Sequence, residues 1–533
     1  MKYLVLILSF FLIGCSSSKS PVDLAVESKI FHYGNGTEPQ GIDPHIVTGV
    51  PEHHLLLALC EGLTSSNPRG GESLPGSASS WTVSEDGKTY TFYLQKNGKW
   101  SNGDPVTAND FVWSWERVLT ASLGSQYPDM LYSVVNAEEF HTGLISDFSM
   151  VGVRAINEDV LQVTLKEPTP FFLGLLSHYS TWPVHKPTVL EHGSIDDRNG
   201  QWTRPGNFVC NGPFNLKSWE LNKKIVVGKN PLYWDANIVE LNEIHFYPIS
   251  NEMTEERMFR AGQLHVTNTF PSNKCEPDIQ EKNPNLQIHP YMGTYFYRFN
   301  TKNEALKDVR VRKALAYSID RKKIVESVTR CGQIPAYSFT PPGSNGFFPD
   351  TKIPFDVELA KSLLKDAGYE SGESFPVLEI LFNTSEGHRK VALAIQQMWQ
   401  QNLGINVELV NQDWKVYLSR EMIGDFQVSR AGWIGDYEDP NTFLDTLRPN
   451  RGNNKTGWDN YEFDNLLIKA NATLDTEERY KILMEAERLL IDEMPIAPIY
   501  TYVRVYQLHE DVKGWYPNIL SHHHPKYLRI END

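Results

Sequence analysis

One stretch of the sequence, residues 377–410, restricts the folds open to this chain more than any other. It begins with VLEILF, an apolar run of strand length. Val391, Ile395 and Trp399 follow at spacings that put them on one helical face, and Gly404 then precedes a second strand-like run, INVELV. A strand, a helix and a strand at this spacing form a crossover between parallel strands. The stretch therefore predicts an α/β fold.

Other segments predict antiparallel pairing and more helices. Apolar and polar residues alternate over Thr89–Leu94, which predicts a strand. Thr-Ala-Asn-Asp at residues 107–110 resembles a capping box, and the sequence FVWSWERVL that follows it predicts a helix. Residues 214–219 and 224–227 flank a short polar turn and predict a hairpin. The remaining predicted elements are a helix that is capped by Asp356 and ends at Ala367, a helix over 477–490 and a strand over 499–505. With 533 residues, the chain is long enough for about three or four domains.

The N-terminus predicts export from the cytoplasm. A basic start, Met1-Lys2, precedes the apolar run from Tyr3 to Gly14. This run is too short to span a bilayer, which needs about 20 residues, but has the length of a secretory signal. No other stretch is long and apolar enough to predict a transmembrane helix.

A cysteine at the end of the apolar run predicts a lipid anchor. Cys15 follows Leu12-Ile13-Gly14 and precedes three serines, an arrangement that resembles a bacterial lipobox. We therefore interpret residues 1–14 as a lipoprotein signal peptide and residues 15–24 as a lipidated tether. An ordinary signal peptide with a chance cysteine is the alternative. Acyl chains on Cys15 would hold the mature protein on a bacterial membrane, in the periplasm or at the cell surface.

Charge and cysteine spacing exclude two classes of protein. The chain has 66 acidic and 50 basic residues, and a net charge of −16 argues against nucleic-acid binding, which needs a basic face. Four cysteines remain after Cys15, and none forms a CxxC pair, so a zinc site of cysteine spacing is not predicted. An exported location permits zero, one or two disulfides among them. These cysteines are Cys60, Cys210, Cys275 and Cys331.

The usual catalytic motifs are absent. Gly87-Lys88-Thr89 lacks the leading glycine of a phosphate-binding loop because position 82 is Thr82, and the sequence contains no HExxH. We interpret His522–His524 as a solvated surface turn, because adjacent side chains rarely converge on one metal ion. The same interpretation applies to His53-His54.

A dense group of carboxylates lies at Asp436, Glu438 and Asp439, with Asp445 nearby. Two such groups a few ångströms apart could act as the acid and base of a glycosidase. The alternative is that one acid supplies a binding charge and the others face solvent. The spacing alone favours neither interpretation.

Several ordered motifs resemble one known family. The segment Trp81–Val118 carries a tryptophan, a Ser-x-Asp-Gly turn, a Tyr-Thr-Phe strand, a Trp-Ser-x-Gly turn and a Thr-Ala-x-Asp-Phe helix start. These resemble the signature of solute-binding protein family 5, the peptide-binding proteins of ABC importers. Asn211–Phe214, Asp308–Arg312 and Arg430–Tyr437 resemble later parts of the family in the same order. The resemblance covers nearly the whole mature chain and is greatest to the oligopeptide-binding members.

The resemblance implies a fold and a domain division. The fold would be α/β, a two-lobed periplasmic-binding-protein type II fold with an additional third domain, whose lobes close on the ligand about a hinge. Lobe one would comprise residues 25–60, 186–291 and 505–533. The extra domain would comprise residues 61–185, and lobe two residues 292–504.

The same resemblance implies a function without chemistry. The protein would be an extracytoplasmic lipoprotein that captures short peptides and delivers them to a membrane-embedded ABC permease. It would need no catalytic residue, metal or cofactor, and it would act as a monomer. A dedicated receptor for cell-wall or signal peptides is the alternative within this class. A hydrolase using the Asp436 cluster is disfavoured because no base, nucleophile or metal set can be assigned, and a nickel or haem receptor is disfavoured by Asp436 itself.

Family positions assign roles at the amine and along the peptide backbone. Asp436 matches the acid that binds the ligand's amine; its alternative role is to cap a helix at Asp439-Pro440. A receptor for many peptides must rely on the backbone that all peptides share, which it can read by strand addition. The matching positions are Gly432 and Ile434 in lobe two and Val50, with its neighbour Gly49, in lobe one.

Other family positions face the ligand's carboxylate and side chains. Arg430 and His388 match the carboxylate end, although His388 could equally be a simple helix-start residue. A second family arginine aligns with Glu421. Either the neighbouring Arg420 replaces it, or the protein uses a longer or different ligand. Aromatic residues complete the set of matches. Trp433, Tyr127 and Tyr502 match the lining of the cleft, whereas for Trp414 a core position is the preferred interpretation.

Overall fold

The computed structural model describes residues 19–449 and 451–532. The predicted signal peptide and Cys15 therefore lie outside the described residues. Within the described ranges, no helix is both long and apolar enough to cross a membrane. The two ends of the described chain lie close together: the Lys29 ammonium donates a hydrogen bond of 2.8 Å to the Ile530 carbonyl.

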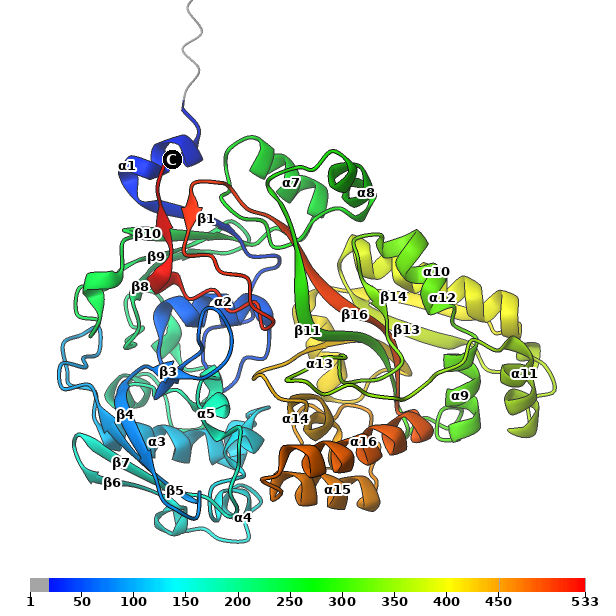
Figure 1. Cartoon of the computed structure of the whole chain (residues 1–533), viewed down its shortest axis with the longest axis horizontal. Helices are drawn as coiled ribbons and strands as arrows, with labels where there is room; N and C mark the ends of the chain where they lie inside the picture. Colours follow the sequence, from blue (N-terminus) through cyan, green and yellow to red (C-terminus); the bar gives the residue numbers. More distant parts are fainter. Residues whose placement is uncertain (1–18, 450, 533) are drawn as a thin grey trace, which may run out of the picture.

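The first of three larger sheets joins the N-terminal segment to the middle of the chain (Figure 1). Its strand order is β1-β10-β9-β8, with β1 parallel to β10 and the other pairs antiparallel. The antiparallel pairing of β8 with β9 confirms the predicted hairpin. The strands are β1 Ile30–Gly34, β8 Phe214–Glu220, β9 Lys224–Lys229 and β10 Glu243–Tyr247.

The second sheet is formed by the part of the chain that lies between β1 and β8 in the sequence. It is antiparallel, with the order β4-β5-β7-β6. Helix α3, Ala108–Leu119, packs against it and begins at the predicted capping box, where the Thr107 backbone N–H donates to the Asp110 carboxylate at 2.7 Å. The strands are β4 Ala78–Val83, β5 Thr89–Leu94, β6 Val153–Asn157 and β7 Val160–Thr164.

The third sheet has six strands in the order β12-β16-β11-β15-β13-β14. Parallel pairing of β13 with β14 around helix α12, Glu386–Leu403, confirms the predicted crossover and with it the α/β class. Val391, Ile395 and Trp399 are buried on the inner face of α12, as their spacing predicts. The strands are β11 Leu286–Phe299, β12 Ile334–Pro335, β13 Leu378–Asn383, β14 Val407–Gln412, β15 Val428–Ile434 and β16 Ile496–Gln507.

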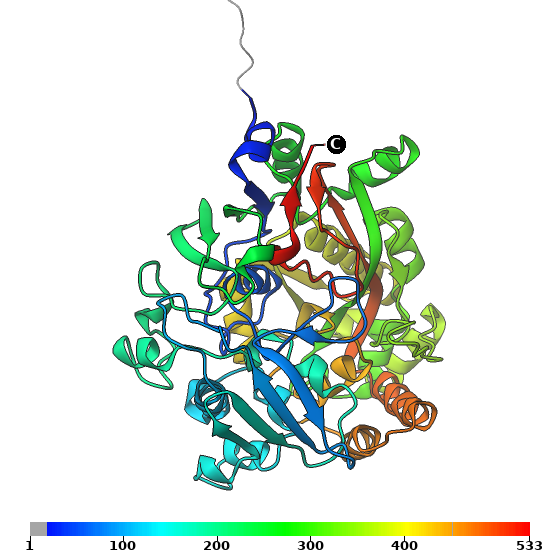
Figure 2. The same ribbon diagram turned by 60° about the vertical axis from the view of Figure 1, so that its left-hand side comes forward.

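Two long strands, β11 and β16, connect the two halves of the molecule (Figures 1 and 2). They pair over Leu286–Pro290 at one end and over Thr294–Arg298 at the other, and the register shifts between Pro290 and Thr294. At this interruption the rings of Tyr291 and Tyr502 lie 6.1 Å apart. The chain thus crosses between the halves twice, and the ladder is broken where it crosses.

Helices cover the remaining faces of the sheets and carry much of the core. Asp356 caps α11 through the Leu359 N–H, as predicted. The other helices are α1 Pro21–Ser28, α2 Val50–Leu59, α4 Ala137–His141, α5 Phe172–Leu175, α6 Lys186–Glu191, α7 Glu252–Arg260, α8 Ser272–Gln280, α9 Val309–Tyr317, α10 Arg321–Ile324, α11 Val357–Asp366, α13 Trp414–Met422, α14 Asn441–Leu444, α15 Tyr461–Asn471 and α16 Thr476–Glu493.

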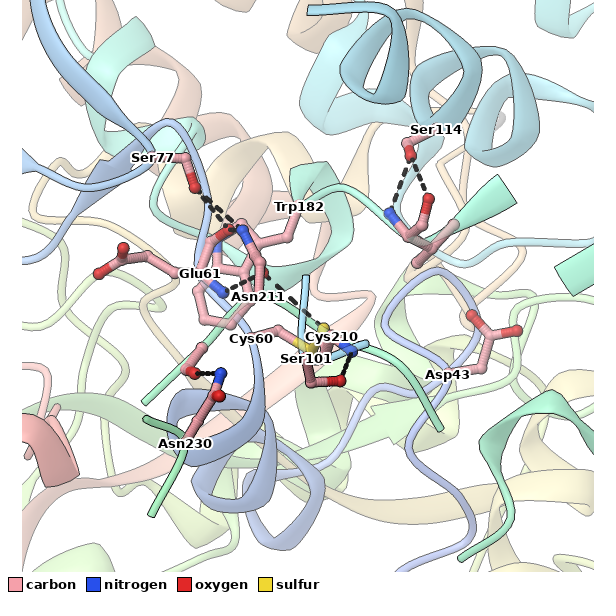
Figure 3. Close-up of a disulfide and its surroundings, with 12 residues drawn as sticks. Asp43, Cys60, Glu61, Ser77, Ser101, Ser114, Trp182, Cys210, Asn211 and Asn230 are labelled. Carbon is pink, nitrogen blue, oxygen red and sulfur yellow. Dashed lines mark hydrogen bonds between the residues drawn. A yellow bond between two sulfur atoms is a disulfide. The ribbon is translucent and has the colours of Figure 1, made fainter. Parts of the chain in front are cut away.

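Two disulfides use the four cysteines that follow Cys15. Cys60, at the end of α2, is bonded to Cys210, which precedes β8 (Figure 3). Next to it the Asn211 amide donates to the Glu61 carbonyl at 2.8 Å and to the Ser77 hydroxyl at 3.0 Å. The second disulfide joins Cys275 of α8 to Cys331. Both bonds therefore fix segments that are distant in sequence, 150 and 56 residues apart.

We expect the two disulfides to stabilise the fold unequally. The chain-entropy model assigns a longer closed loop a larger effect, and the ratio of 150 to 56 residues corresponds to a difference of about 1 kcal/mol. Replacing Cys60 and Cys210 by serine should lower the free energy of unfolding by about 3–5 kcal/mol, and replacing Cys275 and Cys331 by less. Denaturant unfolding of both double variants measures this, and wild-type stability in either would contradict the expectation.

Candidate functional site

A cavity of about 510 Å³ lies where the two halves of the molecule meet. One side is formed by the start of α2, by the segments at residues 126–127 and 178–179, and by residues 520–522 near the C-terminus. The other side is formed by β15, α12 and α13, and the crossing strand β16 closes the back. Many of the cavity residues match the ligand-binding positions and wall residues considered from the sequence, and these include Gly49, Val50, Tyr127, His388, Trp414, Arg430, Gly432, Trp433, Ile434, Asp436 and Tyr502.

The strand β15 presents a free edge to this cavity. On one side it pairs with β11 along its whole length, but on the other side β13 pairs only with Val428 and Ser429. Hydrogen bonding alternates along an antiparallel pair, and the Gly435 N–H donates to the Met292 carbonyl opposite at 2.8 Å. The backbone polar groups of Ile434 and Gly432 therefore point away from β11, toward the edge that β13 leaves open. An extended ligand can add to this edge as a strand.

Position 432 on that strand must be a glycine, because neighbouring side chains fill the space that a Cβ would occupy. A Cβ at this position would lie 2.5 Å from the Tyr502 hydroxyl and 3.3 Å from Arg430 Nη2. No side chain fits there while Arg430 and Tyr502 remain bonded to each other at 2.8 Å. The glycine thus lets the backbone, the arginine and the tyrosine occupy one layer.

The opposite wall differs from the prediction. Val50 lines the cavity, but it is the first residue of α2 rather than part of a strand. Gly49 is extended and its carbonyl accepts the His53 N–H at 3.0 Å, so it serves the helix as its N-cap. Pro51, at the second helical position, favours this start. Val50 therefore lines the cavity wall, and α2 offers no strand edge with which a peptide backbone could pair.

Asp436 lies at one end of the free edge with an uncompensated charge. Its Oδ1 is 3.4 Å from His178 Nε2, whereas its buried Oδ2 has no hydrogen-bond partner among the described residues. Burial, and secondly the nearby charge of Asp129, raises the pKa of Asp436 well above its ordinary value. At the start of α14 the carboxylate of Asp439, and not that of Asp436, accepts the Asn441 N–H at 2.9 Å. Asp436 is thus free to receive a cation.

Five histidines that were predicted to lie in solvated turns are buried instead, and three of them, His53, His54 and His522, line the cavity. His53, His54, His522, His523 and His524 are each less than a tenth exposed, because α2 and the C-terminal segment pack against one another. The rings of His53 and His522 lie 4.4 Å apart. Burial lowers the pKa of His522 to about 4. The histidines are therefore neutral near pH 7 and do not compete with a ligand cation.

The other end of the edge carries a buried guanidinium. Arg430 Nη1 donates to the Asn383 amide oxygen at 3.2 Å, its guanidinium lies 4.8 Å from the Tyr295 ring centre, and its Nε has no partner among the described residues. His388 faces the same ring at 5.7 Å, and burial, with the charge of Arg430, lowers its pKa well below 6.5. Its backbone N–H donates to the Ser385 hydroxyl at 3.4 Å, so His388 is a helix-start residue whose side chain also lines the cavity. This end is suited to an anion.

Arg420 does not belong to the cavity, and the prediction for it is wrong. Its guanidinium is bound by Glu379 and Asp425, each at 2.9 Å, on the opposite face of α13. Glu421, one position further along the helix, lines the cavity and pairs with Arg298 at 2.6 Å. Where the family resemblance places a cation, the cavity therefore contains a neutral ion pair.

Aromatic side chains line the middle of the cavity. Trp433 lies 6.5 Å from Tyr127, ring to ring, and its indole N–H has no partner among the described residues. Trp414 stacks on the core residue Tyr417 at 5.6 Å and also lines the cavity, so it combines the core position with a cavity position. Such rings offer broad apolar contact without dictating one side chain.

Several other cavity residues were not identified from the sequence, among them His178, Asn383 and Lys455. His178 and Asn383 contact the residues at the two ends, and Lys455 bonds Gln126 and the Gly452 carbonyl. Burial lowers the pKa of Lys455 to about 8. Each comes from a separate segment without a motif, so only the fold could bring them together. Among the described residues, no three His, Cys, Asp or Glu side chains are grouped to hold a metal ion.

Comparison with known proteins agrees with this geometry. Residues 72–455 match the family model for bacterial extracellular solute-binding proteins, family 5. The chain is 38% identical to the oligopeptide-binding protein OppA of Bacillus subtilis over 94% of this chain and 91% of that protein. Haemophilus influenzae OppA in complex with the peptide RPPGFSPFR has a TM-score of 0.90 at 34% identity, covering 95% of this chain and 99% of its own.

A second solved structure distinguishes two arrangements of the same fold. The murein tripeptide binding protein MppA, in an unliganded open form, is also 34% identical to the chain and covers 95% of it and 98% of its own chain. Its TM-score is only 0.64. The sequences are equally similar, so the lower score reflects how the halves are placed. The halves of the present structure are arranged as in the peptide complex.

We expect the ion pair of Glu421 with Arg298 to be a strong structural constraint on the cavity. Glu421→Gln leaves a buried guanidinium without its counter-charge and should lower the free energy of unfolding by about 3 kcal/mol. Glu379→Gln is the matched control, because the Glu379 carboxylate binds Arg420 while 31% exposed and should cost less than about 1 kcal/mol. Denaturant unfolding compares the two, and equal losses would contradict this assignment.

Proposed function

The chain belongs to the bacterial extracellular solute-binding proteins of family 5, and we propose that it binds short peptides in the central cavity and delivers them to a membrane-embedded ABC permease. One observation carries the proposal. A free strand edge runs between a carboxylate without a cation, Asp436, and a buried guanidinium, Arg430. An extended peptide has the complementary order of charges, with an amine at one end and a carboxylate at the other.

Each part of the peptide has a proposed partner. Asp436 binds the amine, and Gly432 and Ile434 pair with the peptide backbone. Arg430 and His388 bind the carboxylate end. The wall residues that contact side chains are Val50, Tyr127, Trp414, Trp433 and Tyr502. Because Arg430 and Asp436 are six positions apart, their backbones are separated by at most about 20 Å, which an extended peptide of about six residues spans.

The proposed domain division follows the crossing strands. Residues 25–60, 186–291 and 505–533 form lobe one, residues 61–185 the extra domain and residues 292–504 lobe two. The shifted register between Pro290 and Thr294 supports a hinge, because an interrupted ladder bends more easily than a continuous one. Closing about it would bring Asp436 of lobe two against His178 of the extra domain.

Two alternatives are weighed against the same geometry. A receptor dedicated to cell-wall peptides is compatible with it, and the similar protein MppA is a murein tripeptide binding protein. A hydrolase is less well supported, because the neighbours of Asp436 are already engaged: Asp439 binds Arg479 at 2.7 Å, and Glu438 accepts the Gly71 N–H at 2.8 Å. Peptides recovered intact after incubation would favour a receptor over a hydrolase.

The first test addresses the amine. Asp436→Asn should weaken binding of Ala-Ala-Ala by about 30-fold or more, because a desolvated charge partner is lost. N-acetylation of the peptide should weaken its binding to the wild type by a similar factor. It should weaken binding to Asp436→Asn little further, because the substitution and the acetylation remove the same interaction. Isothermal titration measures all four combinations.

A neighbouring carboxylate provides the matched control. Glu438→Gln should change the affinity less than about threefold, because this side chain is half exposed and does not line the central cavity. Equal binding of the free and acetylated peptides by the wild type would contradict the proposal.

Mass spectrometry of molecules released on unfolding the purified protein should show short peptides with free amines.

We further propose that acyl chains on Cys15 hold the protein at a bacterial membrane. Acyl chains bind a bilayer with about 0.8 kcal/mol for each buried CH₂ group, so two or more give stable attachment. Cys15→Ser should move the protein from the membrane fraction to the soluble fraction and abolish incorporation of labelled palmitate, whereas Ser16→Ala should not. Retention of Cys15→Ser in the membrane fraction would refute a lipid anchor at this residue.

A further inference from the structure

The disulfide between Cys275 and Cys331 lies beside the two strands that cross between the halves of the molecule. Both cysteines are buried in a small apolar cluster, against which Leu286 of β11 and Val505 of β16 pack. These two strand residues lie on the first side of the register shift, where β11 and β16 pair over Leu286–Pro290. The disulfide is therefore anchored at one end of the crossing strands.

The chain that follows Cys331 runs to the other end of the same strands. Ile334 begins β12 and pairs with Thr501 of β16. Thr501 in turn pairs with Thr294 of β11, on the second side of the register shift. Cys331 and Ile334 are three positions apart, and such a segment spans at most about 11 Å when fully extended. A short covalent connection thus bridges the interruption in the ladder.

This connection lies on the cavity side of the crossing strands. Cys331 and Gln333 both line the central cavity, and the Cys331 N–H donates to the Gln333 side chain at 3.0 Å. Between them Gly332 rests on β11, since a Cβ there would lie 3.8 Å from Ile288 Cγ2. A connection on this side of a hinge is stretched when the halves separate, whereas one behind the strands would be stretched when they close.

The disulfide differs in kind from a nearby contact between the same parts of the molecule. The Lys390 ammonium of α12 donates to the Ser272 hydroxyl of α8 at 3.1 Å, and both residues line the cavity. That hydrogen bond can break when the halves separate. The Cα atoms of Cys275 and Cys331 are 5.3 Å apart and must stay within about 7 Å while their bond is intact.

We propose that the Cys275–Cys331 disulfide and residues 331–334, together called the strap, limit how far the cavity opens and slow the release of a bound ligand. The inference rests on the proposed function and its domain division, in which Cys275 belongs to lobe one and Cys331 to lobe two. The strap then adds a third covalent crossing to those of β11 and β16. Because a ligand leaves after the lobes separate, a limit on their separation lowers the rate of release.

Replacing both Cys275 and Cys331 by serine removes the strap. The unliganded variant should have a larger radius of gyration than the unliganded wild type, and the two should agree when saturated with Ala-Ala-Ala. The variant should also release Ala-Ala-Ala at least about fivefold faster. Small-angle X-ray scattering measures the radius, and stopped-flow tryptophan fluorescence during displacement of the peptide measures the release.

The other disulfide provides the matched control, because Cys60 and Cys210 both belong to proposed lobe one. Replacing this pair by serine closes no gap between the lobes and should leave the radius unchanged and the release rate within about twofold, although it is expected to cost more stability. Inserting Gly-Gly between Gly332 and Gln333 keeps the disulfide but lengthens the strap, and it should reproduce the effect of removing the bond. Melting temperatures confirm that the variants fold.

The outcomes separate the strap from the function on which it rests. If removing the disulfide and lengthening the strap both leave the radius of the unliganded protein unchanged, or both leave the release rate unchanged, the strap is refuted while peptide binding stands. Equal effects of the control pair would assign the change to lost stability and would also refute it. If the wild type binds no peptide, the proposed function fails, and the scattering of the unliganded proteins alone decides whether the strap limits opening.

Discussion

The unequal pairing of one strand determines the rest of the site. β15 is bonded to β11 along its length, which holds it rigidly, while β13 leaves it after two residue pairs. The edge that remains would be a site for unwanted association if it faced solvent. Here it faces a cavity closed by the other half of the molecule, so only an extended chain that enters the cavity can use it. Gly432 keeps that edge approachable, because a side chain there would meet Tyr502.

Two charged groups at the cavity lack a counter-charge of the ordinary kind. Asp439 is paired with Arg479, and Glu421 with Arg298. Asp436 instead faces His178 and keeps an oxygen without a donor, and the Arg430 guanidinium donates only to the neutral groups of Asn383 and Tyr502. Leaving buried charge incompletely satisfied is costly, so such groups are expected where a ligand completes them. They lie at opposite ends of the free strand edge, which gives a bound peptide one direction.

How much the sequence could predict depended on the range of the interactions. The crossover around α12, the β8–β9 hairpin and the start of α3 depend on local periodicity, turns and caps, and all are confirmed. Arg420 failed because successive helical residues point about 100° apart, so a helix that turns Glu421 inward turns Arg420 outward. Trp414, seven positions before Glu421, shares its face and lines the cavity for the same reason. The buried histidines depend on contacts between remote segments, which no local pattern encodes.

The residues around Asp436 come from both halves of the molecule, which would couple the binding of a peptide amine to closure of the cavity. Asp436 belongs to the strand side of the cavity, but His178 and Tyr127, which lie beside it, come from the other half of the molecule. A ligand amine would therefore be enclosed from both sides only in the closed arrangement, and a ligand can shift an equilibrium only by its difference in affinity for the two states. Closing without a ligand would bury the free charge of Asp436 beside Asp129 with no cation present, which is unfavourable. If Asp436 binds the peptide's amine as proposed, its carboxylate would oppose closure in the absence of a peptide, and the closed form would report a loaded cavity.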